Sequence, residues 1–281
     1  MKFGDRTLRM RSKGRDVEEL QLRLAGFSGT TWDGGFGPNT KKQVVQFQRD
    51  YMNLARPDGI VGPRTFTALN VFANQFTIDV GALGCPSKSG SDSEFCDCRG
   101  YGQHRFNKLY LKTRSPMVLD WSRSGKDELS ESKHQYEYPG IHKAVLHTYR
   151  AFLFYADTGK YIKTRITSGY RCHLNNIEKR RTSTNHMGKA VDFSFNVGRG
   201  QTKWKVCNDA RDLLVEKSNC QIRWNKSNHK ALEPGHPGVG REFTADSWVH
   251  IDVRQYDDKY LQDRFFVSSE KELDNKELGE S

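Results

Sequence analysis

The first quarter of the chain combines helical apolar spacing with glycine-rich turns. Val17 and Leu20 belong to an apolar stripe over 16–24, which predicts one helix. Two similar turns follow at 33–40 and 58–65, and each runs into a proline. Proline suits the first position of a helix, because the amide hydrogen that it lacks has no helical partner there. The repeat therefore predicts a second and a third helix, and so a small three-helix domain.

Further along, the period of the apolar residues changes between helix and strand. Helical spacing predicts helices over 141–155 and 203–217, and a period of two predicts strands over 162–168, 190–195 and 248–253. In each of the last two strands, bulky apolar residues on one face alternate with residues such as Asp192 or His250 on the other. We expect a short strand over 221–224 and a loop over 225–240 between them. The predicted fold class is α + (α+β): the three-helix domain followed by an α+β domain with an antiparallel sheet.

Changes in composition mark the boundaries between these parts. Residues 77–100 shift to Gly, Ser, Cys and Asp, which indicates a flexible linker. The acidic stretch 268–281 is poor in apolar residues, and we expect it to be disordered. The predicted division is a first domain at 1–76, the linker at 77–100, a second domain at 101–267 with its core at 139–255, and the tail at 268–281.

The polar faces of the two later strands carry a metal-binding pattern. His186 precedes a glycine turn, Asp192 follows six positions on, and His250 lies in the last strand. Two imidazoles and a carboxylate are the protein ligands of an open zinc site, which leaves the fourth position for water. Zinc lowers the pKa of such a water to roughly 7 and polarises a carbonyl group. The pattern therefore predicts hydrolysis at one catalytic zinc ion, and ordinary strands with polar outer faces are the alternative.

Three motifs together resemble one family. The sequence has Ser168-Gly169-Tyr170-Arg171, then His186-Met187-Gly188-Lys189-Ala190-Val191-Asp192, then Trp248-Val249-His250. This set is similar to the zinc peptidases related to D-alanyl-D-alanine carboxypeptidases, hedgehog domains and phage L-alanyl-D-glutamate endolysins, although one residue instead of two separates His186 from Gly188. The resemblance spans roughly 139–255 and implies zinc ligation by His186, Asp192 and His250. It also implies that Arg171 holds the substrate carbonyl or the developing oxyanion, and that Ser168, Tyr170 and Trp248 bind substrate. A structural salt bridge is the alternative role for Arg171.

The general base is the residue that the resemblance leaves open. The family usually carries Glu or Asp three residues before the last His, and Ser247 stands there. Asp246 is one position further back, and four residues of straight strand at about 3.3 Å each separate it from His250 by ~13 Å. A bulge near Ser247 brings the carboxylate closer. We therefore predict Asp246 as the base, and the alternatives are Glu242, Glu233 and His236.

The repeat in the first domain carries a second resemblance. Its copies read Asp33-Gly34-Gly35-Phe36-Gly37-Pro38-Asn39-Thr40 and Asp58-Gly59-Ile60-Val61-Gly62-Pro63-Arg64-Thr65. With Phe47-Gln48 between them, they resemble the peptidoglycan-binding domain that is fused to many cell-wall hydrolases, over nearly all of 14–72. The resemblance implies that bacterial peptidoglycan is the partner. A repeat that serves folding alone is one alternative. A DNA-binding module is another, but no helix has the basic face with polar base readers of a recognition helix.

Composition narrows the classes of function. The 281 residues carry a formal net charge of +11, which favours a polyanionic partner such as an acidic wall polymer, a membrane surface or nucleic acid. No stretch approaches the ~18 apolar residues of a membrane span, so we expect no stable membrane insertion. The polar start at 1–15 has no apolar run that resembles a signal peptide. We therefore expect synthesis in the host cytoplasm. We also expect a monomer that binds peptidoglycan and does not bind nucleic acid.

The six cysteines are too few for a disulfide scaffold in a chain of this size. Cys96 and Cys98 are the close pair, and a zinc knuckle there has free or incidentally oxidised thiols as its alternative. Cys207 and Cys220 can form a disulfide if the protein reaches an oxidising compartment.

The two resemblances combined are similar to a modular phage endolysin, which acts on the cell wall after the membrane is permeabilised. The expected reaction is hydrolysis of a peptide bond in peptidoglycan, either at L-alanyl-D-glutamate or at a D-alanyl cross-link. A catalytically inert, zinc-containing wall-binding protein is the alternative, which the missing carboxylate at Ser247 supports. A glycosidase is disfavoured, because no pairing of carboxylates in the sequence calls for it.

Overall fold

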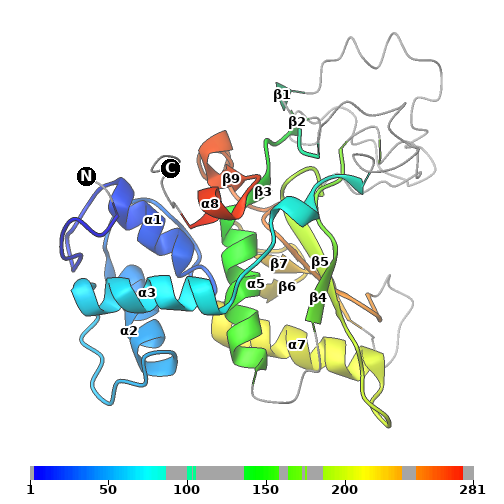
Figure 1. The fold of residues 1–281 in the computed structure, drawn as a ribbon, viewed down its shortest axis with the longest axis horizontal. Coiled ribbons are helices and arrows are strands. Elements are labelled where there is room, and N and C mark those ends of the chain that lie inside the picture. Colours follow the sequence, from blue (N-terminus) through cyan, green and yellow to red (C-terminus); the bar gives the residue numbers. More distant parts are fainter. Residues whose placement is uncertain are drawn as a thin grey trace.

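The computed structural model describes residues 3–86, 100–102, 104–105, 136–157, 164–172, 175, 186–235 and 245–274. It has an N-terminal three-helix region followed by an α+β domain with a mixed, mostly antiparallel sheet (Figure 1). The predicted fold class is therefore confirmed. The residue limits of the predicted domains stay a prediction.

Three helices form the N-terminal region: α1 (Arg15–Arg23), α2 (Pro38–Asp50) and α3 (Pro63–Gln75). The helices α2 and α3 each begin at the proline of one sequence repeat, as the pattern predicts. Their apolar faces and that of α1 meet in one core, in which Val17 and Phe47 are fully buried. Figure 1 shows these helices together at one side of the molecule, next to α5 (Lys143–Ala156) of the following domain.

Each repeat turn is closed by one buried glutamine. Gln21 Nε2 donates to Asp33 Oδ1 at 2.9 Å and to the Gly35 carbonyl at 3.1 Å, and Gln21 Oε1 accepts from the Gly34 amide at 2.9 Å. Gly34 adopts a φ of +71°, which glycine tolerates without steric cost. The second turn repeats these bonds around Gln48, with Asp58 Oδ1 at 2.8 Å, the Ile60 carbonyl at 3.0 Å and the Gly59 amide at 2.8 Å.

One five-stranded sheet forms the base of the α+β domain. Its order is β4-β5-β8-β7-β6, with β6 and β7 parallel and the other neighbours antiparallel. The strands are β4 (Thr164–Ser168), β5 (Ala190–Phe195), β8 (Val249–Asp252), β7 (Ala231–Leu232) and β6 (Gln221–Ile222). The strand β7 lies inside the predicted loop over 225–240, since two residues are too few for a period to appear.

The helices α5 and α7 (Lys203–Ser218) pack on this sheet and on each other. The predicted apolar faces of β5 and β8 point into the core, where Val191, Phe193, Val249 and Ile251 are each 0% exposed. Alternation places the polar residues of these strands on the opposite face. The two helices thus cover the apolar face of the sheet, and the polar residues of β5 and β8 lie on the other face.

Several short elements complete the described structure. They are η1 (Gly81–Leu83), β1 (His104–Arg105) paired with β2 (Tyr136–Glu137), β3 (Ile141–His142) paired with β9 (Phe266–Val267), η7 (Asp258–Tyr260), η8 (Asp263–Phe265) and α8 (Glu270–Leu273). The expected disorder of 268–281 is wrong for 268–274, because Ser269 caps α8 and Leu273 is 0% exposed. One anchoring leucine in an acidic stretch is a weak sequence signal.

The N-terminal helices and the α+β domain share a buried interface. The helix α1 packs against α5, and Lys143 Nζ lies 3.1 Å from Glu19 Oε2. Trp32 is 1% exposed and stacks on Tyr256 at 4.6 Å between ring centroids. Lys230 Nζ donates to the Ala25 carbonyl at 2.6 Å. Buried charges and stacked rings across the boundary indicate a fixed arrangement of the two parts.

The segment that joins them is packed where the structure describes it. Composition predicts a flexible linker over 77–100, but Ile78, Val80 and Cys85 are buried in the core of the α+β domain. The amide of Tyr170 donates to the Leu83 carbonyl at 2.7 Å. A few apolar side chains in the first ten residues thus outweigh the average composition, while 87–99 lie outside the described residues.

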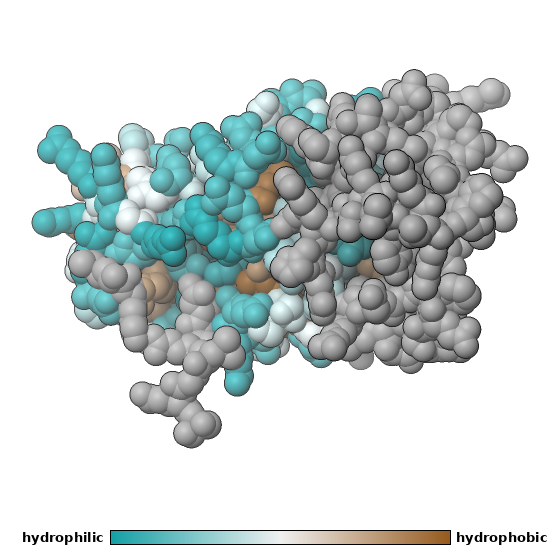
Figure 2. Space-filling view, turned by 90° about the horizontal axis from the view of Figure 1, so that it is seen from above, coloured by the Kyte–Doolittle hydropathy of each residue, from teal (hydrophilic) through white to brown (hydrophobic). Residues whose placement is uncertain are grey.

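Hydrophilic side chains dominate the coloured part of the face in Figure 2, with small hydrophobic areas between them. Among the helices that the structure describes, none has the length and apolar character needed to cross a bilayer.

Candidate metal centre

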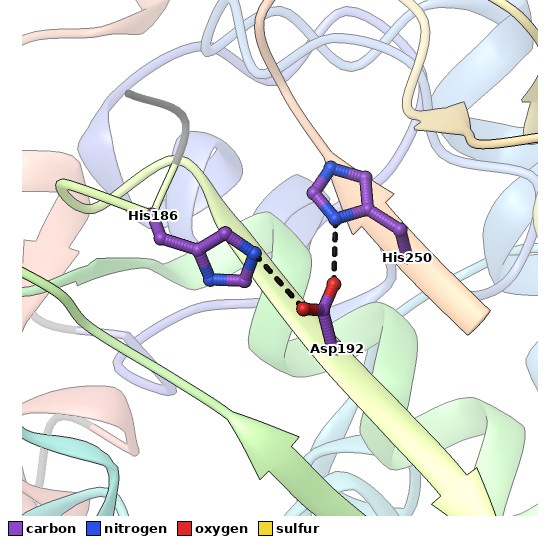
Figure 3. A group of neighbouring side chains, drawn as sticks. All are labelled: His186, Asp192 and His250. Atoms are coloured by element: carbon purple, nitrogen blue, oxygen red, sulfur yellow. Dashed lines mark hydrogen bonds and ion pairs between the residues drawn. The ribbon is translucent and has the colours of Figure 1, made fainter. Parts of the chain in front are cut away.

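Three side chains from separate parts of the sequence converge beside the central strands (Figure 3). Ligand atoms of His186, Asp192 and His250 all lie within 4.8 Å of one another. Within the described residues, these three form the one group of histidines, cysteines and carboxylates with such spacing. The structure therefore brings together the three predicted metal ligands.

Strand pairing and a glycine turn position these ligands. Antiparallel pairing sets Asp192 of β5 directly opposite His250 of β8. His186 comes from the turn before β5, in which Gly188 has a φ of +122°. A Cβ on Gly188 would lie 2.7 Å from the Gly140 carbonyl oxygen, so glycine is required there. The single residue between His186 and Gly188, which differs from the family pattern, is compatible with this convergence.

Hydrogen bonds orient both imidazoles toward the Asp192 carboxylate. His186 Nδ1 lies 2.8 Å from the Gly169 carbonyl, to which it must donate, and Nε2 lies 3.2 Å from Asp192 Oδ2. His250 Nδ1 lies 2.7 Å from Asp192 Oδ1, and its Nε2 lies 2.8 Å from Asp252 Oδ2. In each ring, one nitrogen is thus engaged outside the cluster and the other faces its centre (Figure 3).

The charges of the cluster suit a cation. Burial lowers the pKa of His186 below its usual value, although the Asp192 carboxylate opposes this shift. Burial raises the pKa of Asp192, but the neighbouring imidazoles outweigh it and hold that pKa below its usual range. Burial lowers the pKa of His250, but hydrogen bonds to Asp192 and Asp252 outweigh it and raise this pKa to about 9. A metal ion bound between them would therefore replace the proton on His250.

The donor set fits zinc. Two imidazole nitrogens and one carboxylate oxygen are ligands that Zn²⁺ accepts, and three protein ligands leave a position open. Ligating histidines in proteins usually donate their outer N–H to a carbonyl or carboxylate, as His186 does to Gly169 and His250 to Asp252. The inner and outer contacts of both rings are thus those of a metal site.

The cluster opens on a cleft of about 980 Å³. Asp192 lines it, together with the predicted site residues Ser168, Tyr170, Arg171 and Trp248. Residues 81–86, which follow the N-terminal helices, form part of its wall. The predicted substrate-binding residues therefore do lie together beside the ligands, and their role toward a substrate stays a prediction.

Arg171 lies beside the predicted metal ligands. Its Nη2 lies 3.9 Å from Asp192 Oδ2, and its amide donates to the His186 carbonyl at 2.8 Å. The side chain is 11% exposed. Both roles considered for Arg171, an ion pair and an oxyanion ligand, are compatible with this position.

The predicted general base, Asp246, does not line the cleft with the other site residues. It precedes β8 near α7. Burial lowers the pKa of Arg211 and raises the pKa of Cys207, and the negative charge of Asp246 acts to raise both. Of the alternatives, Glu233 accepts a hydrogen bond from Arg211 Nε through its carbonyl at 2.9 Å, and 242 and 236 lie outside the described residues. The identity of the base stays a prediction.

Asp252 is a residue near the site that the sequence reasoning did not select. It is 0% exposed and is hydrogen-bonded to His250 Nε2. The alternation of Trp248, His250 and Asp252 along one strand was the available signal, since such residues share a face.

The cysteines do not add a disulfide within the described residues. Cys207 and Cys220, the pair considered for a disulfide in an oxidising compartment, are both buried free thiols. Cys85 and Cys172 approach to 3.5 Å between their Sγ atoms. Positions 96 and 98 lie outside the described residues, so the zinc knuckle considered there stays untested.

Comparisons with known proteins concern the N-terminal region. Residues 13–69 match the family described as "Putative peptidoglycan binding domain", which confirms the predicted peptidoglycan-binding domain. A zinc D-Ala-D-Ala carboxypeptidase of Streptomyces albus G is 46% identical over 67 residues, which are 22% of this chain and 26% of that protein. The chain thus matches about a quarter of the length of this relative. His186, Asp192 and His250 lie outside the residues that match the family.

Proposed function

We propose that the protein binds peptidoglycan through its N-terminal domain and hydrolyses a peptide bond of this polymer at one catalytic zinc ion. The observation that carries the proposal is the convergence of His186, Asp192 and His250 beside a cleft of about 980 Å³. The name of the relative adds support, because a zinc carboxypeptidase carries a similar N-terminal region.

Each residue of the cluster has a chemical task in this proposal. Zinc, when bound, supplies a Lewis acid that activates water near neutral pH. His186, Asp192 and His250 hold it. Arg171 is next to Asp192 and can donate charge-assisted hydrogen bonds to a substrate carbonyl or to the oxyanion that develops from it.

The proton must pass from the attacking water to the leaving amine, which requires a base. Asp246 remains our candidate, although it does not line the cleft in this structure. Asp246→Asn should abolish turnover and leave zinc binding intact. Full activity in that variant would exclude Asp246.

The fixed interface between the two parts supports a wall-directed substrate. Buried contacts such as Lys143 to Glu19 hold the peptidoglycan-binding domain against the domain with the cleft. Binding to the polymer therefore keeps the cleft close to peptide stems. The bond is either L-alanyl-D-glutamate or a D-alanyl linkage, and the endolysin role and action after membrane permeabilisation remain predictions.

A catalytically inert wall-binding protein is the second candidate. It is favoured by Ser247, which stands where the family usually has a carboxylate and is exposed. The two candidates differ in one assay. Purified peptidoglycan is incubated with the protein, with and without a chelator, and new amino termini are measured together with reducing sugar ends.

We expect release of new amino termini that a chelator prevents, with no release of reducing sugar ends. This release should be lost in His186→Ala. Mass spectrometry of the soluble fragments then identifies the bond. Binding to peptidoglycan without any release of amino termini would favour the inert protein.

A further inference from the structure

A second carboxylate lies behind His250. His250 and Asp252 are two positions apart on β8, so their side chains share one face of the strand. Asp252 Oδ2 lies 2.8 Å from His250 Nε2, while Asp192 Oδ1 lies 2.7 Å from Nδ1. The imidazole is therefore held between two carboxylates, and its own side chain is 2% exposed.

Asp252 is itself held in place by two neighbours. Its Oδ1 accepts from the Arg254 amide at 2.9 Å, and its Oδ2 accepts from Arg254 Nε at 2.6 Å. Trp224 Nε1 donates to Oδ2 at 3.4 Å, and the Arg254 guanidinium lies 4.2 Å from the centroid of the Trp224 ring. A buried carboxylate is unfavourable unless it is paired and hydrogen-bonded. These contacts meet both conditions and fix one orientation of Asp252.

The two carboxylates give the nitrogens of His250 different roles. A carboxylate accepts hydrogen bonds and cannot donate one, so Nε2 carries a hydrogen toward Asp252, and Nδ1 carries one toward Asp192 while no metal ion is bound. Nδ1 faces the centre of the cluster, where a metal ion would take the place of its hydrogen. Nε2 would then remain the donor to Asp252. A flipped ring would present a carbon atom to Asp252 and leave a buried acceptor with one partner fewer.

We propose that Asp252 is a positioning residue that fixes which nitrogen of His250 faces the metal, and that Arg254 and Trp224 hold Asp252 for this task. The inference rests on the metal centre of the proposed function, but not on peptidase activity. At His186 the corresponding outer acceptor is the backbone carbonyl of Gly169. Asp252 therefore offers a way to disturb one ligand by a side-chain substitution that leaves the ligands themselves unchanged.

The test is the zinc affinity of the full-length chain, measured by competition with a chromophoric chelator. Asp252→Asn keeps the shape of the side chain and removes its charge. We expect binding to weaken about 10-fold to 100-fold, as for other outer-shell partners of ligating histidines. Trp224→Phe removes one hydrogen bond to Asp252 and keeps the aromatic ring under Arg254, so zinc affinity should fall, but by less than in Asp252→Asn.

Asp274→Asn is the matched control. It also removes the charge of a buried carboxylate, but the partner of Asp274 is Arg150, with Nη2 and Oδ2 3.1 Å apart. We expect this variant to lose stability and to keep the wild-type zinc affinity. Equal loss of zinc affinity in Asp252→Asn and Asp274→Asn would mean that Asp252 acts through stability alone, and would overturn the inference.

A second measurement needs no variant. Long-range ¹H–¹⁵N NMR spectra of the zinc-loaded wild-type chain report which nitrogen of each histidine carries a proton. We expect His250 to be protonated at Nε2 and bound at Nδ1. Binding at Nε2, or unchanged zinc affinity in Asp252→Asn, would overturn the inference. A zinc-loaded chain that passes both tests but does not cut peptidoglycan would contradict the proposed function alone.

Discussion

Asp192 and His250 face each other across two antiparallel strands, with Asp192 Oδ1 2.7 Å from His250 Nδ1. Their neighbours Val191 and Val249 are both 0% exposed. Because side chains alternate along a strand, a shift of one residue would turn a ligand into the core and a valine out of it. The burial of the apolar residues therefore stabilises the register that sets Asp192 opposite His250.

The charge of Asp192 should matter more than its shape. Asp192→Asn replaces the carboxylate by a neutral amide, a much weaker zinc ligand, so we expect zinc affinity to fall by more than about 100-fold. Isothermal titration calorimetry measures this directly. Ser194→Ala is the matched control on the same face of β5, where Ser194 Oγ donates to the Ser247 carbonyl at 2.7 Å. A variant Asp192→Asn with wild-type affinity would show that Asp192 is not a ligand.

The two parts of the molecule should unfold together. Arg150 of α5 donates through Nε to the Phe76 carbonyl at the end of α3, at 2.9 Å, and forms an ion pair with Asp274, with side chains 1% and 3% exposed. Arg150→Met leaves a buried carboxylate without this partner and should lower the free energy of unfolding by about 3–5 kcal/mol. Arg49→Met is the control, since Arg49 is 60% exposed beside Asp50 and its loss should cost no more than about 1 kcal/mol.

Urea unfolding followed by both tryptophan fluorescence and far-UV circular dichroism measures these changes. We expect one transition that coincides for the two probes. Two separated transitions in the wild-type chain would argue against the shared interface.

The repeat turns should depend on their glutamines. Gln48 is 2% exposed and makes the bonds that close the second turn. In Gln48→Ala these backbone and side-chain groups lose their buried partner, so we expect a loss of about 1–3 kcal/mol in unfolding free energy. Gln75→Ala, which removes an exposed bond to Tyr51, is the control. Equal effects of the two substitutions in chemical denaturation would refute the structural role of Gln48.

Acid should destabilise the fold in part through His142. Burial lowers the pKa of this histidine to about 3, although a hydrogen bond to the Tyr260 carbonyl opposes it. Between pH 6.5 and 3 the unfolded chain therefore binds a proton that the folded chain does not, and stability falls as the pH falls. One such site contributes about 1.4 kcal/mol per pH unit within that window.

His142→Asn removes this titration and keeps an acceptor for the Ala144 amide, which the His142 side chain caps in the wild type. The variant should have a shallower loss of stability between pH 6.5 and 4, as measured by urea unfolding at each pH. Parallel curves for variant and wild type would contradict the assignment of a lowered pKa to His142.

Local sequence signals predicted the elements that carry the site. The alternation of Val191 and Phe193 with Asp192 needs no distant information, because one buried face determines both the strand and its polar side. The prolines at 38 and 63 likewise mark the first residues of α2 and α3. The three predicted ligands follow from their spacing and from the family resemblance, and the structure brings them together.

Features that depend on distant partners were not predictable in this way. Trp32 is buried because Tyr256 stacks on it from far along the chain. Ile78, Val80 and Cys85 are buried because they pack into the core of the second domain. The strand β7 is two residues long and exists through its neighbours β6 and β8. Such contacts override local composition, and no pattern within 77–86 or 225–240 reports them.

Zinc content shows most directly whether His186, Asp192 and His250 hold a metal ion. The purified full-length chain and the variants His186→Ala, Asp192→Ala and His250→Ala are dialysed and then analysed by inductively coupled plasma mass spectrometry, with circular dichroism to confirm folding. We expect one zinc ion per wild-type chain and its loss in each folded variant. A wild-type chain without zinc, or folded variants that retain it in full, would show that these three residues do not form the zinc site.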